Sequence, residues 1–404
     1  MSQLGGFSDV DLRVGAASEP GRYPVSIETP AGDASDWMQL DTGDQSLLQA
    51  LQAIENGETD EDFFFTFGRR LFDALLPGPL AAILRTALGQ AHADARRLRV
   101  RLHLRPPELS ALPWEFLYDP QQDLFWGISS RVVLSRYVMD AAAFKEPLAV
   151  IPPLRLLAAF SSPAGVLPLD LDREREVLTQ ATQRAVDAGR LALHVLAHTT
   201  NTTLRDTLRD VKPHILHFVG HGEFDEQRQA GYLLFEDDDG QTRRVRDRTL
   251  REFFEDAPHT KLVVLNACQG ATTSTRRAFS GLAPALVQRG LPAVVAMRYP
   301  IADDTAIVFA REFYTALTHE TPAAVDVAVS DGRRAIYQDV DPDAPDWGIP
   351  NVFLRADDGA IFAPPQADAE TVQGGTKIQV GNISEISGGS IIIAGGSVKT
   401  GHTG

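Results

Sequence analysis

Two apolar stretches, HILHFVGHG at residues 214–222 and KLVVLNACQG at residues 261–270, are the strongest indication of the fold in the sequence. Each is an uninterrupted run of strand length that ends at a reactive residue, His221 in the first and Cys268 in the second. Strands that are buried on both faces, as in a parallel sheet, show such continuous runs rather than alternation. Because ligands bind beyond the carboxyl ends of parallel strands, we expect His221 and Cys268 to lie at one edge of one sheet.

The same strand and helix patterns extend on both sides of these stretches, from residue 148 to residue 363. Short apolar runs alternate there with amphipathic helical patterns, which is typical of an α/β sandwich with a mostly parallel sheet. The further strands expected are 154–160, 191–197 and 292–297, and the helices expected are 172–190, 202–210, 248–255, 280–289, 304–318 and 322–337.

The residues before and after this region have different patterns. Residues 9–145 predict a mixed α/β region, with a hairpin at 9–30, helices within 45–93 and strands at 98–104 and 130–137. Residues 364–404 form a linker followed by a tail rich in Gly, Ser and β-branched residues. This tail contains two β-prone segments and is either a flexible linker, a short pair of strands or a segment that stacks as cross-β.

Composition excludes several classes of protein. The net charge of −16 and the absence of a basic arm argue against nucleic-acid binding. The single cysteine excludes an internal disulfide and fits a reducing compartment. The N-terminus lacks the features of a signal peptide, and Pro152, Pro153 and Arg155 interrupt the most apolar long stretch. We therefore expect a cytoplasmic protein without membrane segments and without a cofactor.

The chemistry of the two stretches points to a thiol nucleophile. A thiolate at Cys268 is the attacking group, and an imidazole at His221 promotes its formation and protonates the leaving amine. The N–H of Gly222, which no side chain shields, forms an oxyanion hole together with the Cys268 amide in this interpretation. A lone Cys or His is more often a core residue, and we interpret His214 and His217 in that way.

Two other hydrolase classes are weakly supported. Three His and one Cys could bind zinc, but residues 214 and 217 point to opposite faces of a strand, and no His-Glu-x-x-His motif is present. We therefore expect no metal site. No Gly-x-Ser-x-Gly motif is present either, which argues against an α/β-hydrolase.

The His-Gly step followed by NACQG at residues 266–270 resembles the clan CD peptidases, which include caspases, metacaspases and separases. The caspase signature is Gln-Ala-Cys-[Arg/Gln/Gly]-Gly with the His about 50 residues upstream. Asn266 stands where that signature has Gln. The wider pattern resembles the CHAT family of caspase-like proteins, through residues 106–115, 279–286, 292–301, 313–314 and 347–351.

The resemblance implies a caspase-like three-layer α/β/α sandwich at residues 148–363. It also implies that residues 9–145 are a degenerate, non-catalytic companion region. The resemblance further implies that Cys268 is the nucleophile and His221 the base, which fits the expected oxyanion hole of Gly222 and Cys268.

The resemblance also assigns a substrate pocket. It implies that Asn266 and the segment around Arg298 line the S1 pocket. Asp303 and Asp304 follow that segment and would make the pocket acidic, which suits Arg or Lys at P1, as in separases. An Asp at this place can equally cap the helix expected from residue 304.

The tail resembles the amyloid signalling motifs that are attached to effectors in multicellular bacteria. There, a nucleotide-sensing receptor with a matching motif templates assembly of the effector. The leading hypothesis is therefore a cysteine endopeptidase that cleaves protein or peptide substrates and is activated by recruitment or self-assembly through residues 364–404, in a bacterial defence or regulated-death pathway. The alternatives are a catalytically silent caspase-like scaffold and a metal-dependent hydrolase.

Overall fold

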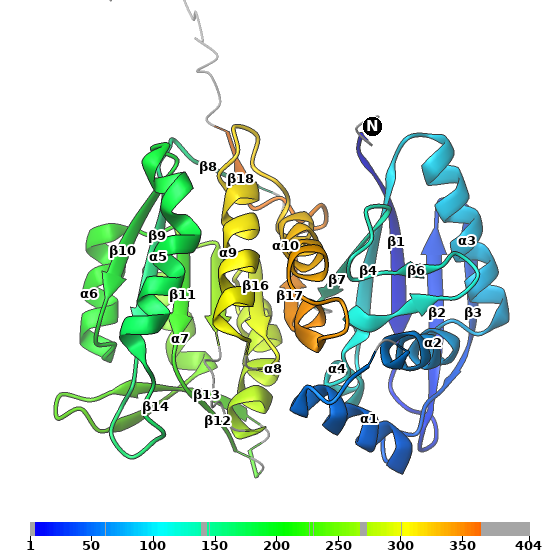
Figure 1. Cartoon of the computed structure of the whole chain (residues 1–404), viewed down its shortest axis with the longest axis horizontal. Coiled ribbons are helices and arrows are strands. Elements are labelled where there is room, and N and C mark those ends of the chain that lie inside the picture. The colour runs from blue at the N-terminus through cyan, green and yellow to red at the C-terminus, as the bar shows by residue number, and fades with distance from the viewer. Residues whose placement is uncertain are drawn as a thin grey trace, which may run out of the picture. The chain divides into compact units, whose positions relative to one another are not determined.

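One large sheet runs through the described part of the chain (Figure 1). The computed structural model describes residues 5–60, 62–138, 144, 146–225, 227–228, 230–266, 273–299 and 301–364, without the side chains of 273–277 and 280. The sheet has 11 strands in the order β10-β9-β11-β15-β16-β17-β7-β4-β1-β2-β3. Residues 364–404 lie almost wholly outside the described residues, and so does every expectation about the tail.

Five neighbouring strands of this sheet are parallel, as the sequence predicts for residues 148–363. Their short apolar sequences are almost wholly buried, except in the edge strand β10, which explains their lack of alternation. The five strands are β9 (Leu154–Phe160), β10 (Leu191–Leu196), β11 (Ile215–Val219), β15 (Leu262–Asn266) and β16 (Ala293–Met297).

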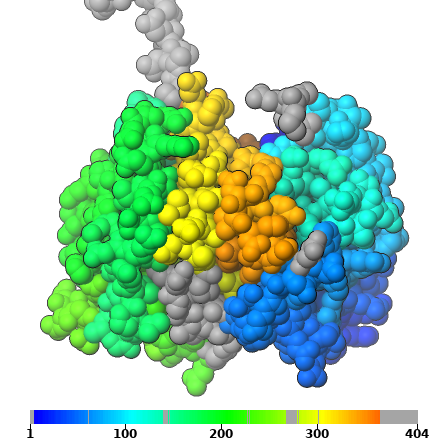
Figure 2. All heavy atoms as spheres, in the orientation of Figure 1, coloured from blue at the N-terminus to red at the C-terminus, as the bar shows by residue number. Residues whose placement is uncertain are grey.

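Helices cover both faces of this parallel part. Alternate side chains of each strand enter two different apolar clusters: Ile215 and Val219 pack on one face, and Leu216 and Phe218 on the other. Helices α5 (Leu171–Asp187), α9 (Asp303–Leu317) and α10 (Val325–Asp339) belong to the first cluster, and α6 (Asn201–Val211), α7 (Asp247–Glu255) and α8 (Thr273–Gln288) to the second. Figure 2 shows α5, α9 and α10 side by side on one face. The α/β class with a mostly parallel sheet is therefore confirmed, and the two helical layers give the expected sandwich.

The N-terminal strands continue the same sheet. Strand β17 (Pro350–Leu354) is antiparallel to β16 and parallel to β7, with Phe353 opposite Arg136. The rest follows as β7 (Val132–Tyr137), β4 (Arg97–Leu104), β1 (Phe7–Val14), β2 (Arg22–Thr29) and β3 (Gly32–Gln39). Helices α1 (Gln45–Asn56), α2 (Phe63–Leu75) and α3 (Gly78–Ala93) contribute buried side chains to the first cluster.

Several elements were not expected from the sequence. Strand β3 was missed because it lies at the sheet edge and carries mostly polar side chains, and β17 because it begins with a proline. A separate antiparallel sheet, β12-β13-β14, follows His221 directly. Its strands are β12 (Gly222–Asp225), β13 (Ala230–Glu236) and β14 (Thr242–Arg246), and the remaining short elements are α4 (Pro107–Ser110), η1 (Trp114–Phe116), β5 (Tyr118–Asp119), β6 (Leu124–Phe125), β8 (Leu148–Ala149), η2 (Pro345–Gly348) and β18 (Phe362–Ala363).

Among the described residues, no single helix is long and apolar enough to cross a membrane. The bent pair α2 and α3, whose axes meet at 105°, passes that test by length and composition when taken together.

Candidate active site

His221 lies at the carboxyl end of β11, between that strand and β12. The imidazole is 4% exposed, and its Nε2 lies 2.7 Å from the main-chain oxygen of Leu167. A carbonyl oxygen can only accept a hydrogen bond, so Nε2 carries the proton in this contact. The other ring nitrogen, Nδ1, is then the one that can take up a proton. The contact therefore fixes both the orientation and the tautomer of the ring.

The Leu167 carbonyl is a site component that the sequence did not reveal. It lies in the connection between β9 and α5, which Ser162 anchors by donating its N–H to Glu236 and accepting from the N–H of Leu169. Ala164 anchors the same connection through its N–H to the Gly240 carbonyl. A main-chain oxygen leaves no residue-type signal, so no sequence pattern could have indicated it.

Gly222 is required by packing. A Cβ atom at this position would lie 2.9 Å from the Cβ of Ala278 and 2.9 Å from the ring of Phe279, both on α8. Such distances are too short for carbon atoms, so a side chain would force β12 away from α8. The glycine next to His221 thus allows α8 to pack against β12.

Strands β11 and β15 end at the same level of the sheet. Val219 of β11 is paired with Asn266 of β15 in a parallel register. His221 comes two residues after Val219, and Cys268 comes two residues after Asn266. Cys268 itself lies outside the described residues, as does its place in the expected oxyanion hole. The register of the flanking strands nevertheless brings the two chain segments out at the same edge of the sheet.

A polar pair lies inside the protein behind this edge. His217 Nδ1 is 2.6 Å from the Tyr314 hydroxyl of α9, and both side chains are buried. Burial lowers the pKa of His217 to about 4 and raises the pKa of Tyr314. The phenol therefore keeps its proton and the imidazole is neutral at pH 7. His217 is a core residue, as the sequence predicted.

These buried histidines should make the protein sensitive to mild acid. A His whose folded-state pKa is about 4 binds its proton less readily than in the unfolded chain, where the pKa is about 6.5. The contribution of this histidine to the free energy of unfolding is therefore fully present above pH 6.5. It decreases as the pH drops towards 4, by about 1.4 kcal/mol per pH unit for each such group. We expect the urea concentration at the midpoint of unfolding to be lower at pH 5 than at pH 7. Burial also lowers the pKa of His214 to about 4, so His217→Gln should weaken this dependence rather than remove it. An unchanged pH dependence in that variant would contradict the assignment.

Asn266 ends β15 beside a small cavity. Its Oδ1 and the Nε2 of His217 are buried, and neither has a hydrogen-bond partner among the described residues. Both residues line a cavity of about 20 Å³ between the sheet and helices α5 and α9, whose wall also includes Glu174, Met297 and Ile301. The end of β15 therefore has a pocket with one donor and one acceptor on its inner wall.

The other three residues expected at the substrate pocket have different surroundings. Arg298 is buried, and its guanidinium donates to the carbonyls of Ser110 and Ala111, far from it in the sequence. Asp303 forms an ion pair with Arg173 of α5 at 2.8 Å, and Asp304 is exposed. Helix α9 begins at Asp303 with Ala302 as its cap residue and no side-chain cap bond, so the expected capping role is wrong.

No group of three or more His, Cys, Asp or Glu side chains that could hold a metal ion occurs within the described ranges.

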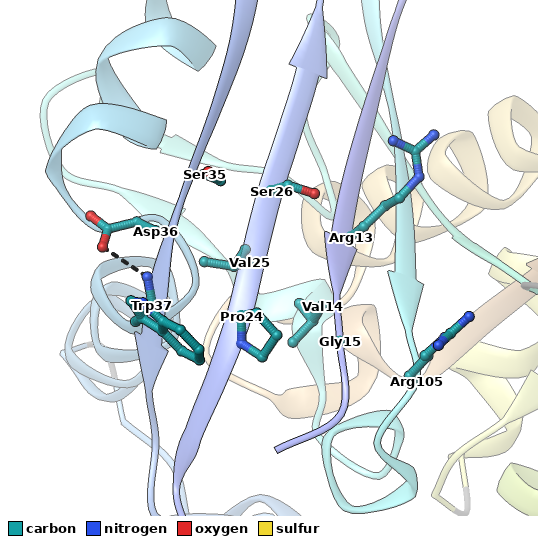
Figure 3. A pocket seen from close by; sticks show the side chains of 10 residues that line it. All are labelled: Arg13, Val14, Gly15, Pro24, Val25, Ser26, Ser35, Asp36, Trp37 and Arg105. Carbon is teal, nitrogen blue, oxygen red and sulfur yellow. Dashed lines mark hydrogen bonds between the residues drawn. The ribbon is translucent and has the colours of Figure 1, made fainter. Parts of the chain in front are cut away.

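A separate hollow lies on the surface of the N-terminal strands. It has a volume of about 520 Å³ and is formed on the open face of β1, β2 and β3, at the end of the sheet remote from β11. Figure 3 shows Trp37, Pro24 and Arg13 around it, with Arg105 at one side. Its described lining includes Ser26, Ser35 and the carboxylate of Asp36, but no His or Cys side chain.

The sequence as a whole matches one family model. The CHAT domain model covers residues 66–364, which include His221, Cys268 and every strand of the large sheet except β1, β2 and β3. The chain belongs to the CHAT domain family. The resemblance inferred from the motifs is thereby confirmed, and no curated protein sequence gives a significant match.

Solved structures with similar folds come from several peptidases. Separase of Saccharomyces cerevisiae in complex with securin is 10% identical with a TM-score of 0.45, over 86% of this chain and 30% of that one. The chain thus spans less than a third of that separase. RgpB of Porphyromonas gingivalis is 12% identical with a TM-score of 0.43, over 71% of each chain. The Drosophila initiator caspase Dronc is 11% identical with a TM-score of 0.31, over 49% of this chain and 79% of that one.

Proposed function

We propose that this CHAT protein is a cysteine endopeptidase with Cys268 as nucleophile and His221 as general base and acid. The observation that carries the proposal is the level ending of β11 and β15, combined with the contact between His221 Nε2 and the Leu167 carbonyl. That contact leaves Nδ1 as the ring nitrogen that can take up a proton. Cys268 comes two residues after the end of β15, as His221 comes two residues after the end of β11.

The proposed reaction follows from this arrangement. His221 Nδ1 takes the thiol proton, and the resulting imidazolium is stabilised by the Leu167 oxygen, which accepts its Nε2–H. The thiolate attacks the scissile carbonyl, and the amides of Gly222 and Cys268 donate to the oxyanion. The imidazolium then protonates the leaving amine, so that a thioester remains. Water, deprotonated by His221, cleaves the thioester and releases the acid product.

The substrate pocket in this proposal is the region at the end of β15. Asn266 remains a contact for the P1 side chain because it ends the strand beside the small cavity. Arg298 does not contact substrate in the proposal, because its guanidinium is bound to main-chain carbonyls inside the protein. A basic P1 preference would depend on Asp304, since Asp303 is already paired with Arg173.

The mode of control is also part of the proposal. Residues 364–404 recruit the protein to a partner with a matching motif or assemble it with other copies, and recruitment activates the peptidase in a bacterial defence or regulated-death pathway. This part rests on the sequence of the tail alone.

The single cysteine allows a direct test. We expect the wild-type protein to hydrolyse at least one member of a fluorogenic peptide set that varies P1 among Arg, Lys, Asp, Gln and Leu. Iodoacetamide should abolish the signal, because Cys268 is the only thiol that it can alkylate, whereas a chelator should leave the signal unchanged. Hydrolysis that survives alkylation, or that a chelator removes, would reject the proposal in favour of a metal-dependent hydrolase. No hydrolysis with the tail assembled would favour a silent scaffold.

A further inference from the structure

A buried carboxylate in the N-terminal half, which comprises the elements from β1 to β7, is the centre of a polar cluster near the end of β16. Glu115 of η1 is 1% exposed and accepts two hydrogen bonds from Arg136, at 3.0 and 2.8 Å. Arg333 of α10 lies 3.8 Å from the same carboxylate. The Asn351 amide, oriented to satisfy both of its neighbours, donates to Glu115 at 2.6 and 2.7 Å and accepts from Arg298 Nε at 3.2 Å.

Arg298 connects this cluster to the end of β16. Its main-chain N–H donates to the Ile349 carbonyl at 3.1 Å, and its guanidinium donates to the carbonyls of Ser110 and Ala111. Arg136 donates to the same Ser110 carbonyl at 2.6 Å and to Leu112 at 2.8 Å. Residues 110–112 are thus held between two arginines that both depend on Glu115, one directly and one through Asn351.

The charges make Glu115 indispensable to this arrangement. Three buried arginines surround one carboxylate, so the cluster carries an excess of positive charge even when Glu115 is ionised. Burial alone would raise the pKa of Glu115, but the charges of Arg136, Arg333 and Arg298 outweigh it and lower the pKa. Without the carboxylate, three desolvated cations would repel each other.

Arg298 links the polar cluster to the cavity beside Asn266. Arg298 directly follows Met297, the last residue of β16, and β16 is the neighbour of β15, which leads to Cys268. Met297 and Ile301 line the same cavity as Asn266. We propose that Glu115 is a positioning residue, through which the N-terminal half fixes the end of β16 and so the wall of the substrate pocket. This inference rests on the proposed function only for its effect on substrate binding.

The test compares two buried carboxylates. Glu115→Gln removes the charge at the cluster. The matched control, Asp326→Asn, removes an equally buried charge whose Arg99 partner lies at 2.8 Å and which has no contact with Arg298. Hydrogen exchange of peptides that cover β16 and the start of α9 gives a readout that needs no activity. Steady-state kinetics on the best fluorogenic peptide give the second readout.

We expect exchange at the end of β16 to become about 10-fold faster in Glu115→Gln and to stay unchanged in Asp326→Asn. KM should rise about 10-fold in Glu115→Gln with kcat changed by less than about threefold, since His221 is not displaced. The inference would be overturned if the end of β16 exchanged at the same rate in Glu115→Gln and Asp326→Asn. It would also be overturned if Glu115→Gln exchanged faster there but hydrolysed the peptide with an unchanged KM. If the wild-type protein cleaves nothing, the proposed function fails, and the exchange experiment still decides whether Glu115 positions β16.

Discussion

Cys268→Ala is expected to abolish peptide hydrolysis, with a loss in kcat on the order of 10⁵-fold, and His221→Ala to lower kcat by about 10³- to 10⁴-fold. In the proposed reaction the thiol forms the covalent bond with the substrate, so its removal leaves no nucleophile. The imidazole moves the proton twice, so its loss leaves a thiol with an ordinary pKa of about 8.5 and a leaving amine without an acid. Because the two groups act as a unit, the double variant should be no slower than Cys268→Ala alone.

Two measurements check the dyad. Steady-state hydrolysis gives the rate losses, with His92→Ala on the exposed end of α3 as the matched control that should retain full activity. The pH dependence of iodoacetamide labelling reports the thiolate directly, since the chain has one cysteine. In His221→Ala, labelling should shift towards the pH range of a free thiol. Retention of hydrolysis within about threefold in His221→Ala would contradict the assignment.

The main features of the fold could be predicted from the sequence where burial is complete. Strands β11 and β15 are buried at every residue and mostly apolar, and such continuous runs favour strands of a parallel sheet. Their register places Val219, two residues before His221, opposite Asn266, two residues before Cys268. The same reasoning failed for β3 and β12–β14, because an edge strand and a small surface sheet contain polar residues that also occur in loops.

The site was predictable only where it depends on residue type. His221 and Cys268 can be proposed from the sequence because their side chains are reactive. The Leu167 contact cannot be proposed in this way, because it uses a main-chain oxygen. For Arg298, in contrast, the sequence suggests a role that its contacts do not support. Its place in the sequence, just after β16, predicts a substrate contact, but its partners Ser110 and Ala111 come from the N-terminal half. Contacts between such distant segments leave no local pattern, so only the structure reveals them.

The N-terminal half contacts the rest of the described chain at more than one place. Besides the Glu115 cluster, an aromatic cluster joins α2, η1, β6 and α10 around Trp347 of η2. The Trp347 ring lies 4.6 Å from that of Phe116, 5.3 Å from Phe125, 5.5 Å from Phe64 and 5.9 Å from Tyr337, measured between centroids. Trp347 comes just before Ile349 and Asn351, which hold Arg298. Packing and polar contacts therefore converge on the same junction between β16 and β17.

Trp347→Ala is expected to destabilise the protein by about 3–5 kcal/mol, because its side chain is 0% exposed and its removal leaves a large cavity between five elements. The control is Trp37→Ala on β3, where the ring is 40% exposed and stacks on Arg22, so the loss should be about 1 kcal/mol or less. Urea unfolding followed by far-UV circular dichroism measures both without depending on tryptophan fluorescence. Because the sheet is continuous across both halves, Trp347→Ala should lower the midpoint of one common transition. A variant in which only part of the signal unfolds early would show that the halves fold separately, and equal losses for the two tryptophans would contradict the packing argument.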